Sequence, residues 1–417
     1  MGCLLCGFCE TCLRLRQARL VLMAGATVGL IALDAAPASA DALLLVDVNS
    51  GQVISEHNST YPWYPASVTK LMTTYVTLKA VRDRRLGLDA LLTVSPTAVA
   101  QNPYKMGFKV GTEVTVDNAL KMLLVHSPND IAVVLAEGVS GSIEKFAEEM
   151  NAEAHDLGMT QTTFVNPNGL PADEQVTSAR DLAILARALI LEFPEYDYYW
   201  HIASIRLGTR IYRNTNRLID AYAGSDGMKT GFTCASGYNL VATATRGGRR
   251  LIAVVLGAKS STNRAIKAAQ LFEFGFATDT PVPGRGALDS LAPIAAPPPD
   301  LREDVCGKNR RRRLAKDGDE GDGAGAALAE GTNAPGEQRV LLRPRLRGAS
   351  LLTSGLAAGI PPVEVYTGPV RDDIASNASI APTPKKALLA VAAKPPAGAR
   401  LSSFRRQHLR GLRERRR

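Results

Sequence analysis

The chain has 417 residues, of which 46% are hydrophobic and 21% charged, a composition typical of a globular protein with a buried core. Its formal net charge of +9 would favour an anionic partner, but the excess lies entirely after residue 284, where 24 Lys and Arg face 14 Asp and Glu. Residues 1–284 carry a net charge of −1, so the basic excess belongs to the tail and says little about the rest of the chain, and we expect no nucleic-acid partner.

The first forty residues have the pattern of an export signal. Three arginines between residues 14 and 19 precede an apolar run at 20–33, and small residues follow up to Ala40. Ala38-Ser39-Ala40 fits a signal-peptidase site, so we expect a signal peptide over residues 1–40 and a mature chain from Asp41. This predicts an exported, periplasmic protein, free or associated with the inner membrane. An uncleaved anchor is the alternative, although the apolar run is short for a membrane span.

Four of the six cysteines lie within the predicted signal, at positions 3, 6, 9 and 12. Their regular spacing resembles that of metal ligands, but no supporting fold surrounds them. The alternatives are a discarded leader and a start codon assigned too early, and we predict no metal site and no cofactor. After cleavage only Cys234 and Cys306 remain. Because Cys306 falls in a segment with the composition of a flexible tail, we expect no structural disulfide.

Strands are predicted at both ends of residues 42–276, with helices between them. Residues 42–48 and 52–55 form strands around the turn Asn49-Ser50-Gly51. Apolar residues at helical spacing predict helices at 67–82, which has one apolar side, and then at 117–125, after 127, at 143–155 and at 179–191. Two strands at 238–245 and 250–256 flank Gly247-Gly248, a hairpin signal, before a helix at 263–276. This order predicts an α+β domain with a helical insertion.

The composition changes near Pro281. The remaining chain contains three consecutive prolines at 297–299, four arginines at 310–313 and an Asp- and Gly-rich stretch at 317–325. Such segments bury too little apolar surface to offset chain entropy, so we expect a folded domain at 41–281 and a largely disordered basic tail at 282–417. The Arg-rich end at 405–417 would suit weak contact with an anionic membrane surface, or it would be a solvated tail.

Three short motifs occur in one order along the predicted domain. They are Ser67-Val68-Thr69-Lys70, Ser127-Pro128-Asn129 and Lys229-Thr230-Gly231. Each motif by itself has a plain structural explanation. A serine often caps a helix, a lysine is usually a solvated surface residue, and an asparagine after a proline often starts a helix. All three in order, each in a suitable local context, indicate a serine acyl-transfer site.

The first motif supplies a nucleophile and a base. Ser67 is predicted to open a helix, where the helix dipole favours a developing anion. Lys70 lies three residues further, on the same face. A serine hydroxyl is a poor nucleophile until a base takes its proton, and Lys70 can serve if its amine is neutral. We expect burial and the nearby positive charge of Lys229 to lower the pKa of Lys70.

The other two motifs supply proton relay and substrate contacts. Ser127 would pass the proton to the leaving amine, and Asn129 would position Lys70 or a peptide carbonyl. Lys229 suits a carboxylate, and Thr230 adds a hydroxyl donor. Gly231 would let the strand edge approach the substrate closely. The backbone N–H groups of Ser67 and Phe232 are the expected oxyanion donors.

At this point the chain resembles the low-molecular-weight penicillin-binding proteins, which are serine-type D-alanyl-D-alanine carboxypeptidases. The resemblance covers about residues 42–276 and is carried by four stretches besides Ser127-Pro128-Asn129. They are Pro65–Thr73, Gly158–Pro171, Thr177–Ala183 and Asp226–Thr233.

The resemblance implies an antiparallel sheet flanked by helices with a mainly helical subdomain, the β-lactamase/transpeptidase-like fold. It also implies that Ser67 forms the acyl-enzyme, that Lys70 and Ser127 complete the catalytic set, and that Lys229 binds the terminal carboxylate. The implied substrates are the pentapeptide stems of peptidoglycan, which would lose their last D-alanine to water. Penicillins are implied as covalent inhibitors because they mimic D-Ala-D-Ala.

Two departures limit what the resemblance implies. Many members have His after Lys-Thr-Gly, where this chain has Phe232, so only a backbone role carries over. Many also have a β-rich domain and an amphipathic anchor helix, whereas the chain after Pro281 reads as flexible and basic. Other functions stay open: a D,D-endopeptidase acting on crosslinks, an inactive wall-binding or penicillin-sensing module, and a serine β-lactamase. The last needs a deacylating Glu, for which Glu174 is the nearest candidate.

Overall fold

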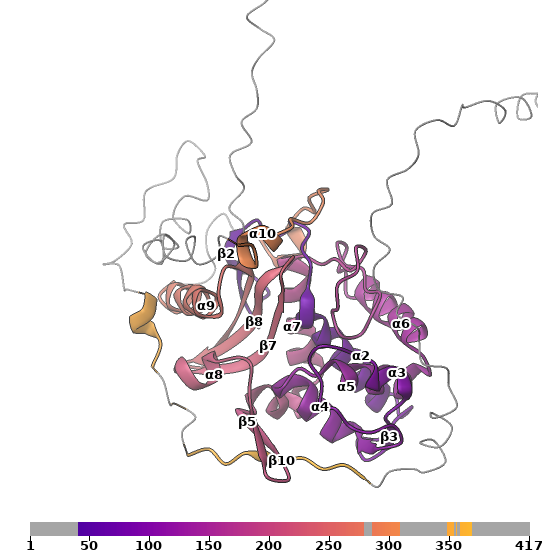
Figure 1. Cartoon of the computed structure of the whole chain (residues 1–417). Helices are drawn as coiled ribbons and strands as arrows, with labels where there is room; N and C mark the ends of the chain where they lie inside the picture. The colour runs from indigo at the N-terminus through magenta and orange to yellow at the C-terminus, as the bar shows by residue number, and fades with distance from the viewer. Residues whose placement is uncertain (1–40, 279–285, 309–347, 354–355, 357–358, 369–417) are drawn as a thin grey trace, which may run out of the picture. The chain divides into compact units, whose positions relative to one another are not determined.

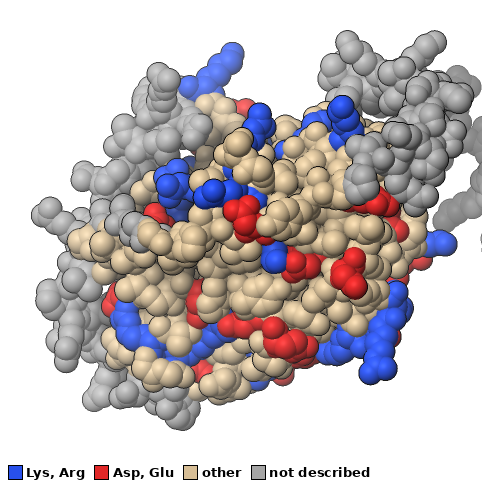
Figure 2. All heavy atoms as spheres, turned by 90° about the horizontal axis from the view of Figure 1, so that it is seen from below, with Lys and Arg blue, Asp and Glu red and all other residues tan. Residues whose placement is uncertain are grey.

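The computed structural model describes residues 41–278, 286–308, 348–353, 356 and 359–368 (Figure 1). The predicted signal at residues 1–40, with its four cysteines, and the Arg-rich end at 405–417 lie outside the described residues. Within those ranges no helix has both the length and the apolar character to span a membrane. On the face shown in Figure 2, acidic and basic side chains are interspersed among uncharged ones.

A five-stranded antiparallel sheet lies at the centre of the fold. Its order is β2 (Val53–His57), β1 (Ala42–Asp47), β9 (Arg249–Ala258), β8 (Gly237–Arg246) and β7 (Ser225–Thr233). Successive side chains of a strand point to opposite faces, so Leu44 and Val46 join one hydrophobic core while Leu43 and Leu45 join the other. The predicted hairpin is confirmed: the turn between β8 and β9 uses Gly247 and Gly248, both with positive φ. Strand β7 lies at the sheet edge.

Helices cover both faces of this sheet. Helix α9 (Ser261–Phe276) packs on one face, and α7 (Ala179–Glu192) packs on the other together with the helical subdomain (Figure 1). Both helices begin where a serine accepts a hydrogen bond from a backbone N–H of the first turn, Ser260 from Asn263 and Ser178 from Asp181. The α+β architecture predicted from the order of the elements is therefore confirmed.

The helical subdomain is built around α2 (Lys70–Arg82). Around it lie α3 (Pro96–Val99), α4 (Val116–Val125), α5 (Asn129–Ser140) and α6 (Ile143–Asp156). The sequence predicted one apolar side for the first helix, but α2 is buried on nearly every side. It tolerates this because its threonines bond internally: Thr74 donates to the Lys70 carbonyl and Thr77 to the Thr73 carbonyl. The subdomain core thus holds a polar helix that hydrophobic periodicity does not describe well.

Several short elements were not predicted because they are too short to show a hydrophobic period. They are β3 (Leu91–Thr93) paired with β4 (Glu113–Thr115), β5 (Ser204–Leu207) paired with β6 (Arg210–Arg213), the 3₁₀ helix η2 (Pro194–His201) and α8 (Leu218–Ala221). Strand β10 (Val363–Glu364) pairs in parallel with β5, and η5 (Gly348–Leu351) precedes it. Part of the predicted tail therefore has defined structure beside the domain.

The segment 286–308 corrects two predictions. It contains η3 (Leu288–Ser290) and α10 (Arg302–Val305), and its Leu288, Leu301 and Val305 are buried against the domain. The segment 286–308 is therefore packed against the domain, whereas the predicted boundary at 281 placed it in a disordered tail. The expected absence of a structural disulfide was wrong, because Cys234 and Cys306 are bonded, with Cα atoms 5.7 Å apart. A few buried side chains and one covalent bond hold a segment whose own composition is that of a flexible chain.

Candidate active site

Ser67 lies in a tight turn that leads into the central helix. Residues 66–69 form the 3₁₀ helix η1, and the α-helix begins at Lys70, one turn later than the sequence predicted. Ala66 has φ of +50°, a left-handed conformation that is uncommon for a residue with a Cβ. Ser67 is half-buried while its neighbours Ala66 and Val68 are buried. The turn therefore presents one hydroxyl to solvent from an otherwise closed backbone.

Lys70 is the centre of a hydrogen-bond network. Its Nζ lies 2.9 Å from Ser67 Oγ, 2.8 Å from Asn129 Oδ1 and 2.9 Å from the carbonyl oxygen of Asn168. Burial of the fully enclosed amine lowers the pKa of Lys70 to about 7, against the opposing negative charge of Asp130. A large fraction of this amine is thus neutral at neutral pH, within direct proton-transfer distance of Ser67.

Ser127 and Lys229 form a second pair beside the first. Ser127 lies between α4 and α5 and has φ of +65°. Pro128 is extended, and α5 begins at the next residue, Asn129. Lys229 Nζ donates to Ser127 Oγ at 2.8 Å and to the Thr230 carbonyl at 2.9 Å. Because Asn129 belongs to the Lys70 network, the loop 127–129 joins the two lysines.

The electrostatic expectation for these lysines needs correction. Burial, rather than the charge of Lys229, lowers the pKa of Lys70. Burial also lowers the pKa of Lys229 well below its usual value, and the positive charges of Lys70 and Arg264 lower it further. Because the positive charge of Lys70 lowers the pKa of Lys229, states in which only one of the two amines is charged are favoured. An incoming carboxylate would relieve the repulsion between the two positive charges.

Strand β7 brings the third motif against the Ser67 turn. A Cβ on Gly231 would lie 2.9 Å from the Pro65 carbonyl oxygen and 3.0 Å from the Ser67 nitrogen. A glycine is therefore required at position 231 for the strand to approach the turn that carries Ser67. The sequence analysis expected this glycine to make room for the substrate instead. Thr230 donates to the Thr215 hydroxyl at 2.9 Å. Phe232 is exposed and its ring packs 4.3 Å from that of Tyr238.

A loop after α6 closes the other side of the Ser67 turn. Gly169 has φ of +80°, and a Cβ there would lie 1.9 Å from the Ala66 carbonyl oxygen. The same loop supplies the Asn168 carbonyl to Lys70, and Thr73 donates to the Pro167 carbonyl at 2.5 Å. Backbone groups thus complete the lysine's environment, and no side-chain pattern in the sequence identifies them.

Two buried polar residues that the sequence analysis missed support the site from beneath. Asn239 on β8 donates to the carbonyl oxygens of Tyr64 and Pro65, 2.9 and 3.0 Å away, and so fixes the chain just before Ser67. Arg264 on α9 donates to the Asn239 carbonyl at 3.1 Å and lies 3.4 Å from that of Gly231. Their only sequence signal is a polar residue at a buried position of a predicted strand or helix.

The remaining candidates take no part in this network. Glu174, the possible deacylating residue of a β-lactamase, is exposed to solvent. His126, which precedes Ser127 in the sequence, is stacked between Tyr104 and Tyr212, as a structural residue would be. Across the described ranges no group of three or more His, Cys, Asp and Glu side chains is placed to hold a metal ion.

Comparisons with known proteins agree with this geometry. A family model described as D-alanyl-D-alanine carboxypeptidase matches residues 31–260. The D-alanyl-D-alanine carboxypeptidase DacC of Escherichia coli is 41% identical over 251 residues, which cover 58% of this chain and 62% of that protein. This chain therefore spans about three-fifths of the length of the curated relative.

Solved structures of penicillin-binding proteins share the fold. Penicillin-binding protein 6B from Escherichia coli matches with a TM-score of 0.55 and 36% identity, covering 59% of this chain and 81% of that one. Penicillin-binding protein D2 from Listeria monocytogenes, in its ampicillin-bound form, matches with a TM-score of 0.50 and 32% identity, covering 56% of this chain and 96% of that one. The fold implied by the sequence resemblance is confirmed.

Proposed function

This chain belongs to the D-alanyl-D-alanine carboxypeptidase family, and from that premise we propose that it is a serine hydrolase acting on peptidoglycan. Its reaction would remove the terminal D-alanine from pentapeptide stems through an acyl-enzyme on Ser67. The observation that carries the proposal is the 2.9 Å contact between Ser67 Oγ and Lys70 Nζ, with the pKa of Lys70 lowered to about 7. A nucleophile and a base matched to neutral pH are thereby in direct contact.

In the acylation step Ser67 Oγ attacks the carbonyl carbon of the last peptide bond, and its proton passes to the neutral Lys70 amine. The tetrahedral intermediate collapses as the C–N bond breaks. The leaving D-alanine amine takes a proton from Ser127 Oγ, and the proton that Lys70 took from Ser67 is passed on to Ser127, so that Lys70 is neutral again before deacylation. The Ser127–Lys229 contact of 2.8 Å supports this relay. The backbone N–H groups of Ser67 and Phe232 are the proposed oxyanion donors.

In the deacylation step a water molecule takes the place of the amine, and Lys70 again acts as the base. Lys70 takes a proton from the water, the oxygen attacks the ester carbonyl, and the proton returns to Ser67 Oγ as the C–O bond breaks. A β-lactam would acylate Ser67 through the same first step because its strained amide occupies the place of the scissile bond. The ampicillin-bound form of penicillin-binding protein D2 from Listeria monocytogenes supports the binding of this class of compound.

Lys229 and Thr230 are the proposed partners of the terminal carboxylate. Lys229 is fully buried and repelled by Lys70 and Arg264, so a carboxylate placed beside it would gain both an ion pair and relief of that repulsion. The Thr230 hydroxyl, already 2.9 Å from that of Thr215, would add a hydrogen bond. This arrangement favours a substrate that ends one residue after the scissile bond.

Incubation with a muropeptide pentapeptide, followed by mass analysis, tests the function. The expected product has lost one alanine, and Ser67→Ala should release none. A fluorescent penicillin should label the wild-type protein and leave Ser67→Ala unlabelled. A label that survives this substitution would remove the proposed role of Ser67.

A second candidate is D,D-endopeptidase activity on crosslinked stems, and one groove favours it. The groove has a volume of about 960 Å³, contains Thr215 beside Thr230, and is lined by Arg213, Arg217 and Arg264. It lies where a leaving group larger than D-alanine would extend, and its arginines would suit the carboxylates of a second stem. A crosslinked dimer that is cleaved at a rate comparable to the pentapeptide would support this candidate.

We infer further that the protein is exported after cleavage at Ala40. The disulfide between Cys234 and Cys306 supports this, because such bonds persist mainly in oxidising compartments such as the periplasm. Amino-terminal sequencing of the protein from its native membrane fraction and periplasm should find Asp41 first. A mature chain that retains Cys3 to Cys12 would contradict export at this position. Cosedimentation with anionic vesicles tests the proposed contact of the basic tail.

A further inference from the structure

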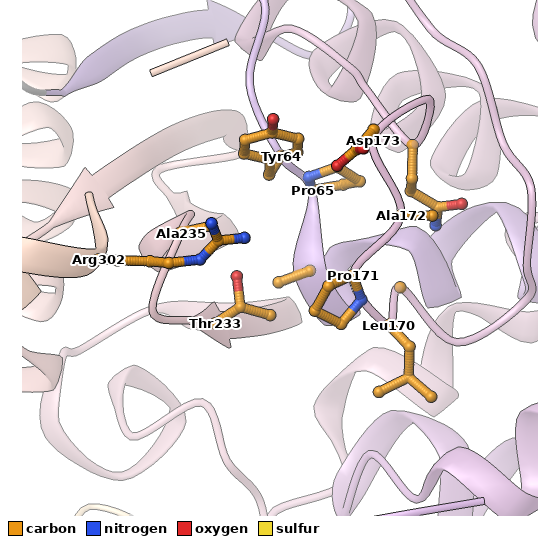
Figure 3. A pocket seen from close by; sticks show the side chains of 12 residues that line it. Tyr64, Pro65, Leu170, Pro171, Ala172, Asp173, Thr233, Ala235 and Arg302 are labelled. Carbon is orange, nitrogen blue, oxygen red and sulfur yellow. The ribbon is translucent and has the colours of Figure 1, made fainter. Parts of the chain in front are cut away.

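A shallow cavity lies immediately beside the Ser67 turn (Figure 3). Its volume is about 20 Å³, which is room for about one water molecule or one oxygen of a bound group. Its walls come from the chain just before Ser67, from the loop that follows Asn168, from the end of β7 and from the segment 286–308. The last of these contributes a single side chain, that of Arg302.

Covalent and hydrogen bonds hold Arg302 at this cavity. It begins the short helix α10, and Cys306 in the next turn is bonded to Cys234, which follows β7 directly. The preceding residue, Leu301, is buried and its N–H donates to the Ala235 carbonyl at 2.9 Å. The segment therefore places a cation next to the catalytic strand, although 68 residues separate Arg302 from Cys234 in the sequence.

The guanidinium group has donors to spare. Its NH1 contacts Asp300 Oδ2 at 2.9 Å, an exposed ion pair of the kind that contributes little. No other acceptor for the Arg302 side chain occurs among the residues that the structure describes. In Figure 3 the side chain reaches into the cavity, opposite Ala172 and Asp173. A planar group with unused N–H donors at the wall of this recess is well suited to a carboxylate.

The geometry of β7 says which part of a substrate would reach Arg302. If the terminal carboxylate binds at Lys229 and Thr230, and the scissile carbonyl lies at Ser67 beside Gly231, the peptide runs antiparallel to β7. Its acyl part then extends past Phe232 towards Thr233, which lines the cavity. Arg302 would therefore meet the part of the stem that stays on the enzyme as the acyl group.

We propose that Arg302 is a specificity-determining residue that binds a carboxylate in the acyl part of the substrate. The inference rests on the proposed function, and it names a feature of the stem that the enzyme would select. Asp173 on the opposite wall sharpens the effect. Asp173 lines the cavity and Asp300 is the ion-pair partner of Arg302, so without Arg302 these two acids remain near the site and no cation balances them. Loss of Arg302 should therefore turn a preference for the carboxylate into a penalty.

Two matched peptides test this. Both end in D-Ala-D-Ala, and one carries a free carboxylate on a residue of the acyl part where the other carries the carboxamide. Arg302→Gln should lower kcat/KM for the acidic peptide about fivefold, a modest factor because the contact is partly exposed to solvent. It should leave kcat/KM for the amide peptide within about twofold of wild type. Asp173→Asn should raise kcat/KM for the acidic peptide about twofold. Added salt should reduce the wild-type preference for the acidic peptide and should also reduce the penalty against it in Arg302→Gln.

A matched control is Arg85→Gln, an exposed arginine paired with Glu149 in the helical subdomain, which should change neither peptide. Replacing both Cys234 and Cys306 by Ser should abolish the preference as Arg302→Gln does, because the tether is lost. Equal ratios of the two kcat/KM values in wild type and Arg302→Gln, with both peptides cleaved, would overturn the inference alone. Cleavage of neither peptide by the wild type would overturn the proposed function, and this inference with it.

Discussion

Two regions lie side by side at the nucleophile and differ in what holds them there. The catalytic cluster is fixed by short hydrogen bonds between buried groups, such as the three from Lys70 Nζ. The segment 286–308 is fixed by three buried apolar side chains, a few backbone hydrogen bonds near its two ends and the Cys234–Cys306 bond. The cluster is costly to disturb because its charges are buried, whereas the segment is held by few interactions and one strong constraint. Chemistry should therefore depend on the first and substrate choice on the second.

The largest expected effect comes from the cluster. Lys70→Ala removes the base and should lower kcat/KM for the pentapeptide about 10³-fold, within the usual range for general base catalysis. Lys79→Ala on the same helix, where the lysine is partly exposed and paired with Glu153, should change the rate less than twofold. Comparable losses for the two variants, measured by alanine release, would mean that the helix and not the amine is what matters.

The next effect tests the close packing around Ser67. Gly169→Ala places a Cβ against the Ala66 carbonyl, and we expect a loss of about 3 kcal/mol in unfolding free energy and at least tenfold slower penicillin acylation. Gly141→Ala is the matched control, because its φ of +83° is similar but nothing lies within 4 Å of the new Cβ. It should cost about 1 kcal/mol from backbone strain alone. Denaturant unfolding of both variants gives the difference, and equal losses would remove the steric explanation.

The same contrast explains which parts of the site the sequence predicted. Ser67 and Lys70 are three residues apart on one turn, so local geometry alone brings them together. Lys229 follows from its motif. The Asn168 carbonyl, Asn239 and Arg264 do not, because a backbone oxygen or a buried polar residue has no distinctive local pattern. The fold followed from the order of strands and helices. The full burial of α2 could not be predicted, because its threonines are polar residues that satisfy their hydrogen bonds within the helix.

The segment 286–308 shows where composition misleads. Three consecutive prolines are typical of a chain that cannot fold by itself, and the segment is anchored to the domain by the buried Leu288, Leu301 and Val305 together with backbone hydrogen bonds. What the composition cannot show is a partner elsewhere. The disulfide closes a loop with a sequence separation of 72, so much of the entropy that disfavours order is already lost in the unfolded oxidised chain. Pairing of two distant cysteines was the missing information.

The double variant Cys234→Ser with Cys306→Ser isolates that constraint. We expect a loss of about 2–4 kcal/mol in unfolding free energy, because the unfolded chain regains the entropy of an open loop. Acylation by a penicillin with an uncharged side chain should stay within about threefold of wild type, since the Lys70 network does not include the segment. Wild type measured with a reductant should match the variant. A large loss of acylation in a folded variant would show that the two regions are not separable.

The smallest expected effect is a shift in the pH dependence of acylation, and it distinguishes the catalytic cluster from the segment 286–308. Lys70 acts as a base only when neutral, so the acylation rate should rise with pH, about tenfold per unit below the midpoint, and level off above it. The midpoint should lie near 7, the value to which burial lowers the pKa of Lys70. Stopped-flow acylation by penicillin across this pH range measures the midpoint.

The double cysteine variant and Arg302→Gln should keep the same midpoint, because neither alters the burial of Lys70. Asn129→Asp, which places a carboxylate where an amide oxygen now lies 2.8 Å from the amine, should raise it. A midpoint that moves with the tether and not with Asn129 would reverse the assignment of chemistry to the cluster and substrate choice to the segment.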